Sequence, residues 1–197
     1  MLDSARIARA LAAHPARTIA VDGRHPAAVL LPVYVREETA TVLFTRRTEH
    51  LKHHRGEISF PGGRWQPADA DLQATALRET EEELGIRAAD VTVLGRLDDF
   101  VSVHGYHVVP FVGTFPWPYG LRVDAGEIAE VIEVPLTTLR DPDLWRQEDW
   151  RHRGRRYPVH FCLVGEHVIW GLTAAILRQF LQRTGGGDAG SNSLLLA

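Results

Sequence analysis

The sequence is poor in cysteine and in long apolar runs, and each shortage excludes a class of protein. A single cysteine, Cys162, stands among 197 residues. One thiol forms no intrachain disulfide and no multi-thiolate zinc site, so Cys162 is expected to be a small buried apolar residue. No apolar run reaches the roughly 18 residues that span a bilayer, and residues 1–14 lack the unbroken apolar segment of a signal peptide. These absences predict a cytoplasmic protein with no membrane partner.

Lysine is also nearly absent, because Lys52 is the only lysine among 22 basic residues. Arginine suits bidentate phosphate contacts, but a bias in genome composition is the simpler account of so uniform a preference. The net charge of -3 argues against broad electrostatic capture of nucleic acid. With 45% hydrophobic and 24% charged residues, the chain has the composition of a globular protein with one sizeable core.

Hydrophobic spacing and turn residues predict one α/β domain over residues 1–184, followed by a flexible Gly/Ser-rich tail over residues 185–197. Helices are expected at residues 3–13, 71–84 and 168–181. Strands are expected at residues 27–36, 40–47, 57–60, 91–103, 106–115, 131–134, 145–151 and 156–164. The two glycines of Pro61-Gly62-Gly63 predict a tight turn.

The helix expected at residues 71–84 carries an acidic stripe. Each helical residue advances about 100°, so Glu82 and Glu83 lie within about 60° of Glu79 on one face. Glu81 points to the opposite side, and an arc that includes Leu84 is suited to packing against a sheet. The pattern therefore separates a buried face from a face of three carboxylates.

Two interpretations of the acidic face stay open at this point. Like charges at these spacings cost a few tenths of a kcal/mol per pair, and a divalent cation would remove that repulsion. Carboxylate oxygens suit Mg²⁺ or Mn²⁺, which bind substrate phosphates as well, and hydrolysis of a phosphoanhydride fits such a site. Alternatively, the glutamates form an ordinary solvated face. The Gly-Gly pair upstream and Arg78 immediately before the cluster favour the metal site.

Other polar and aromatic residues are expected to be structural. The pairs His53-His54 and His104/His107 match no zinc pattern, so they are interpreted as loop or hydrogen-bonding residues. The arginine-rich run at residues 151–156 is interpreted as a solvated hairpin turn. Trp170 and Phe180 on the last predicted helix are expected to lie in the core.

The acidic segment resembles the Nudix box, G-x5-E-x7-R-E-U-x-E-E-x-G-U, where U is aliphatic. The matching residues are Gly63, then Arg78-Glu79-x-x-Glu82-Glu83-x-Gly85-Ile86. This chain departs from the box in three ways. The interval from Gly63 to Arg78 is one residue longer, Asp69 stands in place of the early glutamate, and Thr80 replaces an aliphatic residue.

The segment upstream of the box narrows the resemblance to one subgroup. It is similar to the extension L-L-T-x-R-S-x3-R-x3-G-x3-F-P-G-G that marks coenzyme A pyrophosphatases. The residues here are Leu43-Phe44-Thr45-Arg46-Arg47-Thr48-x3-Lys52-x3-Gly56-x3-Phe60-Pro61-Gly62-Gly63. The two changes, Thr48 for serine and Lys52 for arginine, are chemically mild. Together with the box, the resemblance covers roughly residues 27–182.

The resemblance implies a Nudix-type α/β/α sandwich around a mixed β-sheet. Glu79 and Glu83 would be the principal metal ligands, with Glu82 binding Mg²⁺ or Mn²⁺ directly or through water. Arg78 would orient the cluster by pairing with Glu82 one turn along the helix. Metal ions bridging phosphate oxygens and water would then support attack at neutral pH.

The resemblance also points to residues outside the helix. Many Nudix enzymes take a general base or third metal ligand from a loop after the box, where Glu127 is the first candidate and Glu130 the second; a surface glutamate is the alternative. Arg47, Lys52 and Arg55 are expected to bind the phosphates of coenzyme A, or else to be solvated loop cations. The glycines of the extension, Gly62 and Gly63, are expected to contact the substrate.

The resulting expectation is a metal-dependent diphosphatase that cleaves coenzyme A or its derivatives to 3′,5′-ADP and 4′-phosphopantetheine. One alternative is a Nudix hydrolase for ADP-ribose, a dinucleotide or a nucleoside triphosphate. Another is a non-catalytic Nudix-fold binding module, which the intact glutamates disfavour. The expected partner is a small molecule rather than nucleic acid, and the sequence leaves a monomer and a homo-oligomer both open.

Overall fold

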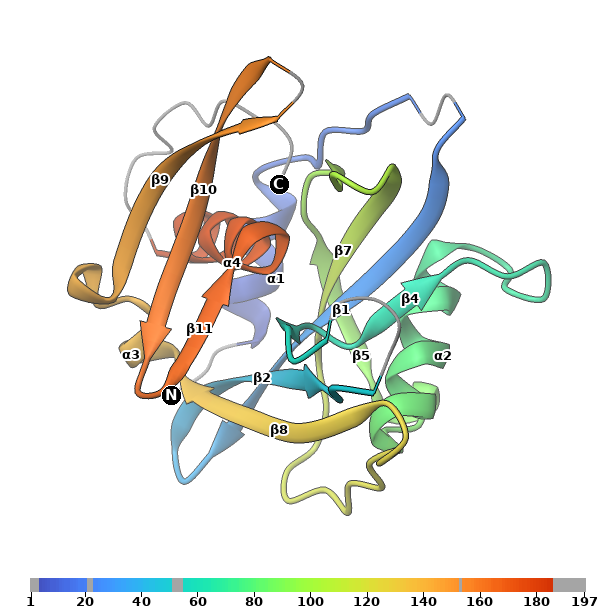
Figure 1. Ribbon diagram of the computed structural model, residues 1–197. Helices are drawn as coiled ribbons and strands as arrows, with labels where there is room; N and C mark the ends of the chain where they lie inside the picture. The colour runs from blue at the N-terminus through green and yellow to red at the C-terminus, as the bar shows by residue number, and fades with distance from the viewer. Residues whose placement is uncertain (1–3, 21–22, 51–54, 153, 186–197) are drawn as a thin grey trace.

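The computed structural model describes residues 4–20, 23–50, 55–152 and 154–185 (Figure 1). Its helices are α1 (Ser4–Ala12), α2 (Leu72–Leu84), α3 (Leu136–Leu139) and α4 (Gly171–Thr184), with short 3-10 turns η1 (Ala88–Asp90) and η2 (Pro142–Leu144). Its strands are β1 (His25–Arg36), β2 (Thr39–Arg47), β3 (Ile58–Ser59), β4 (Gly62–Arg64), β5 (Thr92–Arg96), β6 (Phe100–Val101), β7 (Tyr106–Thr114), β8 (Ile128–Pro135), β9 (Trp145–His152), β10 (Arg155–Val164) and β11 (His167–Trp170).

The strands form two sheets. The larger has eight strands with the central order β3-β2-β1-β7-β5, to which β4, β6 and β8 add at the sides. Strands β1 and β7 run parallel, whereas β1 and β2 form an antiparallel hairpin, so the sheet is mixed as predicted. The smaller sheet has the order β11-β10-β9. The α/β class expected from the sequence is confirmed.

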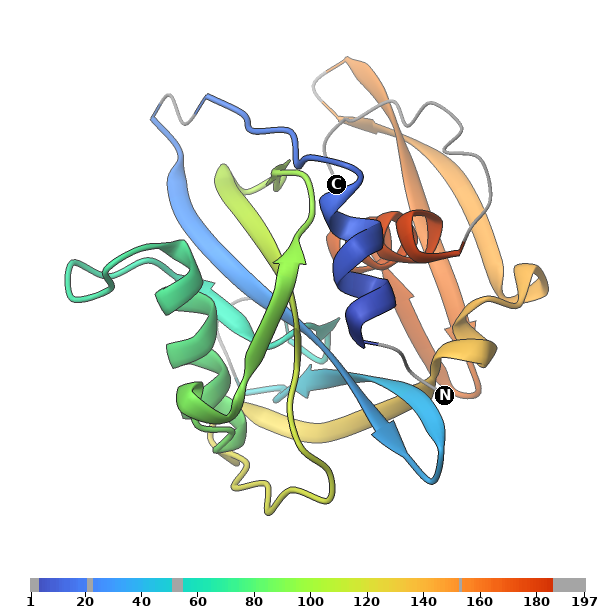
Figure 2. The same cartoon turned by 180° about the vertical axis from the view of Figure 1, so that it is seen from behind.

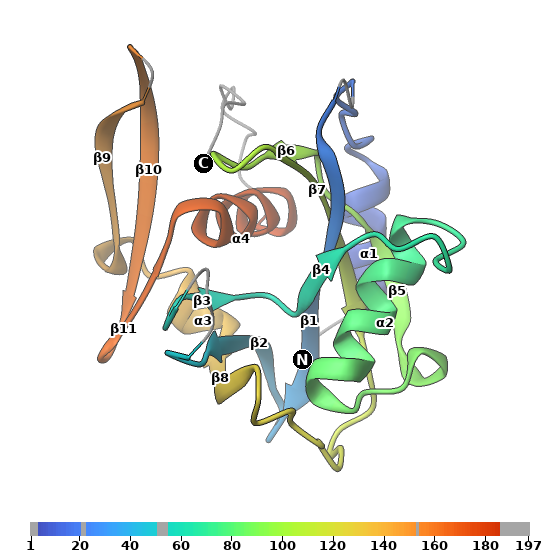
Figure 3. The same ribbon diagram turned by 45° about the vertical axis from the view of Figure 1, so that its right-hand side comes forward.

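Helices cover the two faces of the larger sheet. Helix α2 packs on one face through Ala76, which belongs to a buried cluster with Leu30 and Phe111. Helices α1 and α4 and the smaller sheet lie on the other side, where Ile7 and Phe180 join the main apolar core (Figures 2 and 3). The larger sheet therefore separates α2 from the second layer.

Helix α2 is the element that the sequence predicts best. Its first turn is capped by the Asp71 carboxylate, which accepts a hydrogen bond from the Ala74 backbone N–H at 2.8 Å. Its last turn ends at Gly85, which has a φ of +71° and donates its N–H to the Glu81 carbonyl. Both signals are local in sequence, so the expected bounds of residues 71–84 are confirmed within one residue.

Three expected elements are corrected by the structure. The tight turn at Pro61-Gly62-Gly63 is instead the start of β4, which pairs antiparallel with β1. The helix expected at residues 168–181 begins only at Gly171, because the preceding residues form β11 against β10. The strand expected at residues 91–103 is divided into β5 and β6, and the interruption contains Asp98 and Asp99.

These two aspartates join both ends of the described chain to the sheet. Asp98 accepts hydrogen bonds from the Arg17 backbone N–H at 2.8 Å and from Gln179 Nε2 at 2.8 Å, and it pairs with Arg183. Asp99 accepts from the Ile19 backbone N–H at 3.0 Å and bonds His107 Nε2 at 2.8 Å. His107 is thus a hydrogen-bonding residue, as predicted. The break between β5 and β6 turns two carboxylates inward, where they are fully paired.

Several sequence expectations concern burial or the chain ends. Cys162 and Phe180 are buried, as predicted. Among the helices that the structure describes, none has the length and apolarity needed to cross a bilayer. The tail expected at residues 185–197 lies outside the described residues except for Gly185, and so do Lys52, His53 and His54.

Candidate active site

The acidic stripe of α2 faces the strands β2 and β4. Glu83 is buried, with 5% of its side chain exposed, while Glu79 is 17% exposed and Glu82 is 58% exposed. The exposed fraction of the carboxylate side chains therefore increases from Glu83 through Glu79 to Glu82. Glu81 lies on the other side of the helix, where its Oε2 accepts from the Ala88 backbone N–H.

The glycines of the extension lie directly beneath two of these carboxylates. Gly62 has a φ of +156°, and a Cβ there would collide with the β1 backbone at Ala28 and Val29. At Gly63 a Cβ would stand 2.6 Å from Oε1 of Glu79. Gly62 is required for the close approach of β4 to β1, whereas a side chain at Gly63 would displace the carboxylate of Glu79. Gly63 lies against Glu79 and Gly62 hydrogen-bonds Glu83, and their contact with substrate stays a prediction.

Arg47 and Glu127 complete the cluster from the other side. Arg47, the last residue of β2, lies with Nη1 3.7 Å from Glu83 Oε1 and Nη2 3.4 Å from Glu127 Oε2. The backbone of Glu127 is fixed because its carbonyl accepts the Thr48 N–H at 2.9 Å. The structure therefore brings Glu83 and Glu127 to the Arg47 guanidinium, and Glu79 lies close enough to Glu83 to influence its pKa.

Burial dominates the electrostatics of this cluster. Burial raises the pKa of Glu83 to about 8; Arg47 and a backbone hydrogen bond from Gly62 lower it, while Glu79 and Glu127 raise it further. Burial also raises the pKa of Glu79, against the lowering effect of Arg78. Oε2 of Glu83 has no hydrogen-bond partner although it is buried. A buried carboxylate oxygen with no partner calls for a cation or a donor.

Arg78 holds the helix and the loop before it together. Its Nη1 lies 2.8 Å from Glu82 Oε2, which is the pairing expected from the sequence, and 2.9 Å from Glu79 Oε1. Its Nε and Nη2 lie 2.8 and 3.1 Å from the two oxygens of Asp69. Arg78 thus fixes the directions of both Glu79 and Glu82.

Asp69 supports Arg78 and is not aimed at the other carboxylates. It is buried, and it also accepts hydrogen bonds from Thr75 Oγ1 at 2.9 Å and from the Gln66 backbone N–H at 3.0 Å. Hydrogen bonding from Arg78 lowers the pKa of Asp69 to about 2, and burial opposes the shift. Asp69 was expected only as a departure from the box, and its role as the partner of Arg78 was not predicted. The nine-residue interval between Asp69 and Arg78 holds no signal of their contact.

The third departure from the box, Thr80, has a local explanation. Thr80 is fully buried, and its hydroxyl donates to the Ala76 carbonyl one turn earlier at 2.7 Å. A satisfied hydroxyl can occupy a position that an aliphatic side chain normally fills.

Three further residues are candidates from the sequence: Arg55, Lys52 and Glu130. Arg55 is exposed in the turn before β3, and Lys52 lies outside the described residues. Glu130 pairs with Arg46 Nε at 2.8 Å. Because β2 residues alternate between faces, Arg46 and Glu130 lie on the face of the β2–β8 pair opposite Arg47. Glu130 therefore does not share the cluster that contains Glu127.

The cluster fits a divalent cation. Its donors are carboxylate oxygens, one of them buried without a partner, and a cation would offset both the burial and the carboxylate repulsion that raise the pKa values of Glu79 and Glu83. Within the described ranges, no three histidine, cysteine, aspartate or glutamate side chains are arranged to hold a metal ion by themselves. Mg²⁺ usually takes only one or two protein carboxylates and completes its shell with waters and substrate phosphates.

Comparison with known proteins identifies the family of this chain. Residues 23–153 match the Nudix domain family. The chain belongs to the Nudix family. It is 40% identical over 169 residues to the Nudix hydrolase NudL of Photorhabdus laumondii, an alignment that covers 86% of this chain and 89% of that protein. It is 41% identical over 157 residues to NudL of Yersinia pestis, covering 80% of this chain and 78% of that protein.

Solved structures show the same fold at lower identity. The Nudix hydrolase RenU of M. smegmatis matches with a TM-score of 0.50 and 22% identity, covering 60% of this chain and 74% of that one. The Nudix fold, with its mixed sheet between helices, is thus confirmed. Membership of this hydrolase family implies cleavage of a phosphoanhydride with the help of a divalent metal ion.

Proposed function

We propose that this Nudix hydrolase cleaves the diphosphate linkage of coenzyme A or its thioesters, giving 3′,5′-ADP and 4′-phosphopantetheine. The observation that carries the proposal is the extension upstream of the box. It contains the second half of β2, all of β3 and the start of β4, and both β2 and β4 reach the carboxylates of α2. Arg47 lies on Glu83, and Gly63 lies against Glu79. The part of the chain that resembles coenzyme A pyrophosphatases is therefore the part that meets the proposed catalytic residues.

Each residue has a proposed task in this reaction. Glu79, Glu83 and Glu82 would hold Mg²⁺ or Mn²⁺, and the bound ion would supply positive charge against the diphosphate and acidify the attacking water. Arg47 binds the diphosphate, since its guanidinium already lies between two carboxylates of the cluster. Arg78 keeps Glu79 and Glu82 in position. Glu127, half exposed beside Arg47, accepts the proton of the water.

Turnover of a panel of phosphoanhydrides with Mg²⁺ and with Mn²⁺ tests the proposal. The panel contains coenzyme A, acetyl-coenzyme A, ADP-ribose, a diadenosine polyphosphate and a nucleoside triphosphate, with products identified by mass spectrometry. We expect kcat/KM for a coenzyme A substrate to exceed that for the others by about tenfold or more, a difference of about 1.4 kcal/mol. Preference for ADP-ribose or a dinucleotide would assign another Nudix substrate, and no turnover of any compound would favour a binding module.

Arg47→Gln is expected to lower kcat/KM roughly 10- to 100-fold for coenzyme A and for dephospho-coenzyme A alike. The guanidinium lies at the carboxylate cluster, where the diphosphate common to both substrates binds, and a charge-assisted contact contributes about 1.5–3 kcal/mol. Steady-state rates on both substrates give the ratio of the two losses. A much larger loss on coenzyme A would place the 3′-phosphate at Arg47. Lys52→Gln is the companion variant, for which the sequence predicts the selective loss.

Glu127→Gln is expected to lower kcat on the order of 10²-fold or more, as loss of a general base does. Metal affinity should stay nearly unchanged, and the acidic limb of the pH–rate profile should flatten. Rates across pH with Mg²⁺ and with Mn²⁺ measure these effects. Partial recovery at high Mn²⁺ would make Glu127 a metal ligand, and an unchanged kcat and pH profile would discard both roles.

A further inference from the structure

A cavity with polar and aromatic walls lies where the smaller sheet meets the edge of the larger one. Its volume is about 540 Å³, within the range of about 300–1,000 Å³ that is usual for small-molecule sites. Trp150, Phe161 and Trp170 of the smaller sheet line one side. Strand β11 lies beside β3 (Figure 3), and β3 pairs with β2, so the cavity adjoins the strand that ends at Arg47.

The aromatic side of the cavity is a group of rings in mutual contact. Phe161 and Trp170 are nearly parallel, with 12° between their planes and centroids 6.3 Å apart. Trp150 lies 5.7 Å from Trp170, and 45% of Trp150 is exposed. Its indole N–H donates to Glu148 Oε2 at 2.8 Å, so the ring is held by a polar contact at its edge. The expectation that Trp170 belongs to the core is therefore corrected: it borders this cavity.

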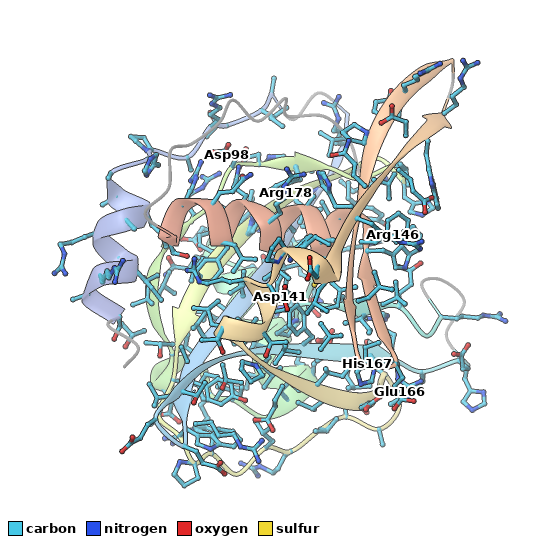
Figure 4. All side chains as sticks on the ribbon, turned by 90° about the vertical axis from the view of Figure 1, so that its left-hand side faces the viewer. Asp98, Asp141, Arg146, Glu166, His167 and Arg178 are labelled. Atoms are coloured by element: carbon cyan, nitrogen blue, oxygen red, sulfur yellow. The ribbon has the colours of Figure 1, made fainter. Side chains whose placement is uncertain are left out.

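The rest of the cavity wall carries two carboxylates, a histidine and the cation Arg46. Glu130 and Glu166 both line it, together with His167. Glu166 and His167 lie together at the turn that joins β10 to β11 (Figure 4). Glu130 lies against Arg46, with His167 Nε2 3.7 Å away. Carboxylates beside aromatic rings suit a planar group that carries an amino substituent, because the rings stack and the oxygens accept its N–H bonds.

The cavity and the carboxylate cluster are one residue apart along β2. Arg46 lines the cavity, whereas Arg47 contacts Glu83. Their Cα atoms are about 3.8 Å apart, and the pairing of β2 with β8 shifts register between them. Because Arg46 and Arg47 face opposite sides of the β2–β8 pair, a nucleotide that contacts both places would pass around the end of β2, with its diphosphate at Arg47 and its base beyond Arg46.

We infer that this cavity binds the amino-bearing nucleobase of the substrate, stacked on Trp150 and Trp170. The inference rests on the proposed function for the position of the diphosphate, and it adds the residues that select the nucleoside. Phe161, Glu166 and Trp170 lie beyond residue 153, where the match to the Nudix domain family ends. The cavity is thus shared between the matched domain, which supplies Trp150 and Glu130, and the segment that follows it.

Equilibrium binding without turnover tests the cavity directly. Isothermal titration calorimetry in EDTA uses 3′,5′-ADP, UDP and 4′-phosphopantetheine as separate probes against the full chain. We expect 3′,5′-ADP to bind more tightly than UDP, whose base has no amino group. Trp150→Leu should weaken 3′,5′-ADP roughly 5- to 100-fold, the usual effect of losing one stacked base, and Trp150→Phe should keep most of the affinity.

The matched control is Leu163→Ala. Leu163 is 37% exposed on the same face of β10 as Phe161 but does not line the cavity, so this variant should bind 3′,5′-ADP like the parent protein. Circular dichroism and thermal midpoints of all variants verify that they fold. With coenzyme A as substrate, Trp150→Leu should raise KM by a similar factor and leave kcat within about twofold.

The outcomes separate the cavity from the proposed reaction. If the parent protein hydrolyses coenzyme A but folded Trp150→Leu binds 3′,5′-ADP as the parent does, the inference is wrong and the reaction stands. If Trp150→Leu weakens the binding of 4′-phosphopantetheine instead, the cavity binds the phosphopantetheine part of coenzyme A. The inference is then also wrong. If coenzyme A is not hydrolysed but 3′,5′-ADP binding still depends on Trp150, the cavity is a base site and another nucleotide is the substrate.

Discussion

Glu83→Gln is expected to reduce kcat by more than the roughly 10- to 100-fold that loss of an outer-shell partner of a metal ligand costs. Glutamine keeps the size and helix propensity of glutamate but removes the charge of the most buried carboxylate in the cluster. That carboxylate has the oxygen without a partner, which is the strongest sign of a cation ligand in the site. Steady-state rates at saturating Mg²⁺ measure the loss.

The same substitution is expected to hold or raise stability when no metal is present. Burial raises the pKa of Glu83 from its ordinary value near 4.5 to about 8. The unfolded chain therefore loses this proton at lower pH than the folded chain does, and metal-free stability falls as pH rises from about 4.5 to about 8. Thermal midpoints in EDTA across that range should fall less in the glutamine variant.

Glu81→Gln is the matched control for Glu83→Gln. Glu81 lies two residues earlier in α2 but on the other side of the helix, and a glutamine can still accept the Ala88 N–H. Its turnover should stay close to that of the parent protein. Near-normal activity of a folded Glu83→Gln variant at saturating Mg²⁺ would remove Glu83 from the site.

Arg78→Ala is expected to destabilise the fold by about 3–5 kcal/mol, because it leaves the buried carboxylate of Asp69 without its cation. Glu79 and Glu82 also lose the guanidinium that positions them, so kcat should fall roughly 10- to 100-fold even where the variant is folded. Urea unfolding gives the first effect, and rates below the unfolding transition give the second.

The pH dependence of stability distinguishes the buried pair from general damage. In the parent protein the pKa of Asp69 is lowered to about 2, so the stability from this pair is present above the ordinary value of 3.8 and is lost as pH falls toward 2. Without Arg78, that contribution at neutral pH should disappear. Adding Asp69→Asn to Arg78→Ala should recover part of the loss, since no charge is then buried alone. An Arg78→Ala variant as stable as the parent would contradict this account.

Helix α2 and its acidic face were predictable because their causes lie within the helix. Asp71 and Gly85 mark the ends, and 3.6-residue periodicity places Glu79 and Glu83 on one face. The β1–β2 hairpin was predictable for the same reason, since its β-branched runs are joined by a short polar stretch. In each case neighbouring residues alone carry the information.

The sequence predictions are wrong where the local structure depends on residues that are far away in the chain. Gly62 and Gly63 form a strand because β1 is available to pair with them. His167–Trp170 extends as β11 because β10 pairs with it, although its apolar residues also fit helical spacing. The contacts of Arg47 with Glu83 and of Arg78 with Asp69 likewise depend on tertiary folding. Sequence periodicity therefore predicted which carboxylates share a face but not which cations they meet.

The paired aspartates between β5 and β6 set a lower limit on the piece of chain that can fold. A recombinant fragment trimmed to residues 23–153 would lose the Arg17 and Ile19 N–H donors and also Gln179 and Arg183. Asp98 would lose these partners, Asp99 would keep only Arg96 and His107, and the apolar side of the sheet would lose the cover of Leu11 and Phe180. We therefore expect protein production and domain-swapping experiments to need both flanking segments, because the matched range leaves out contacts and core residues that the sheet uses.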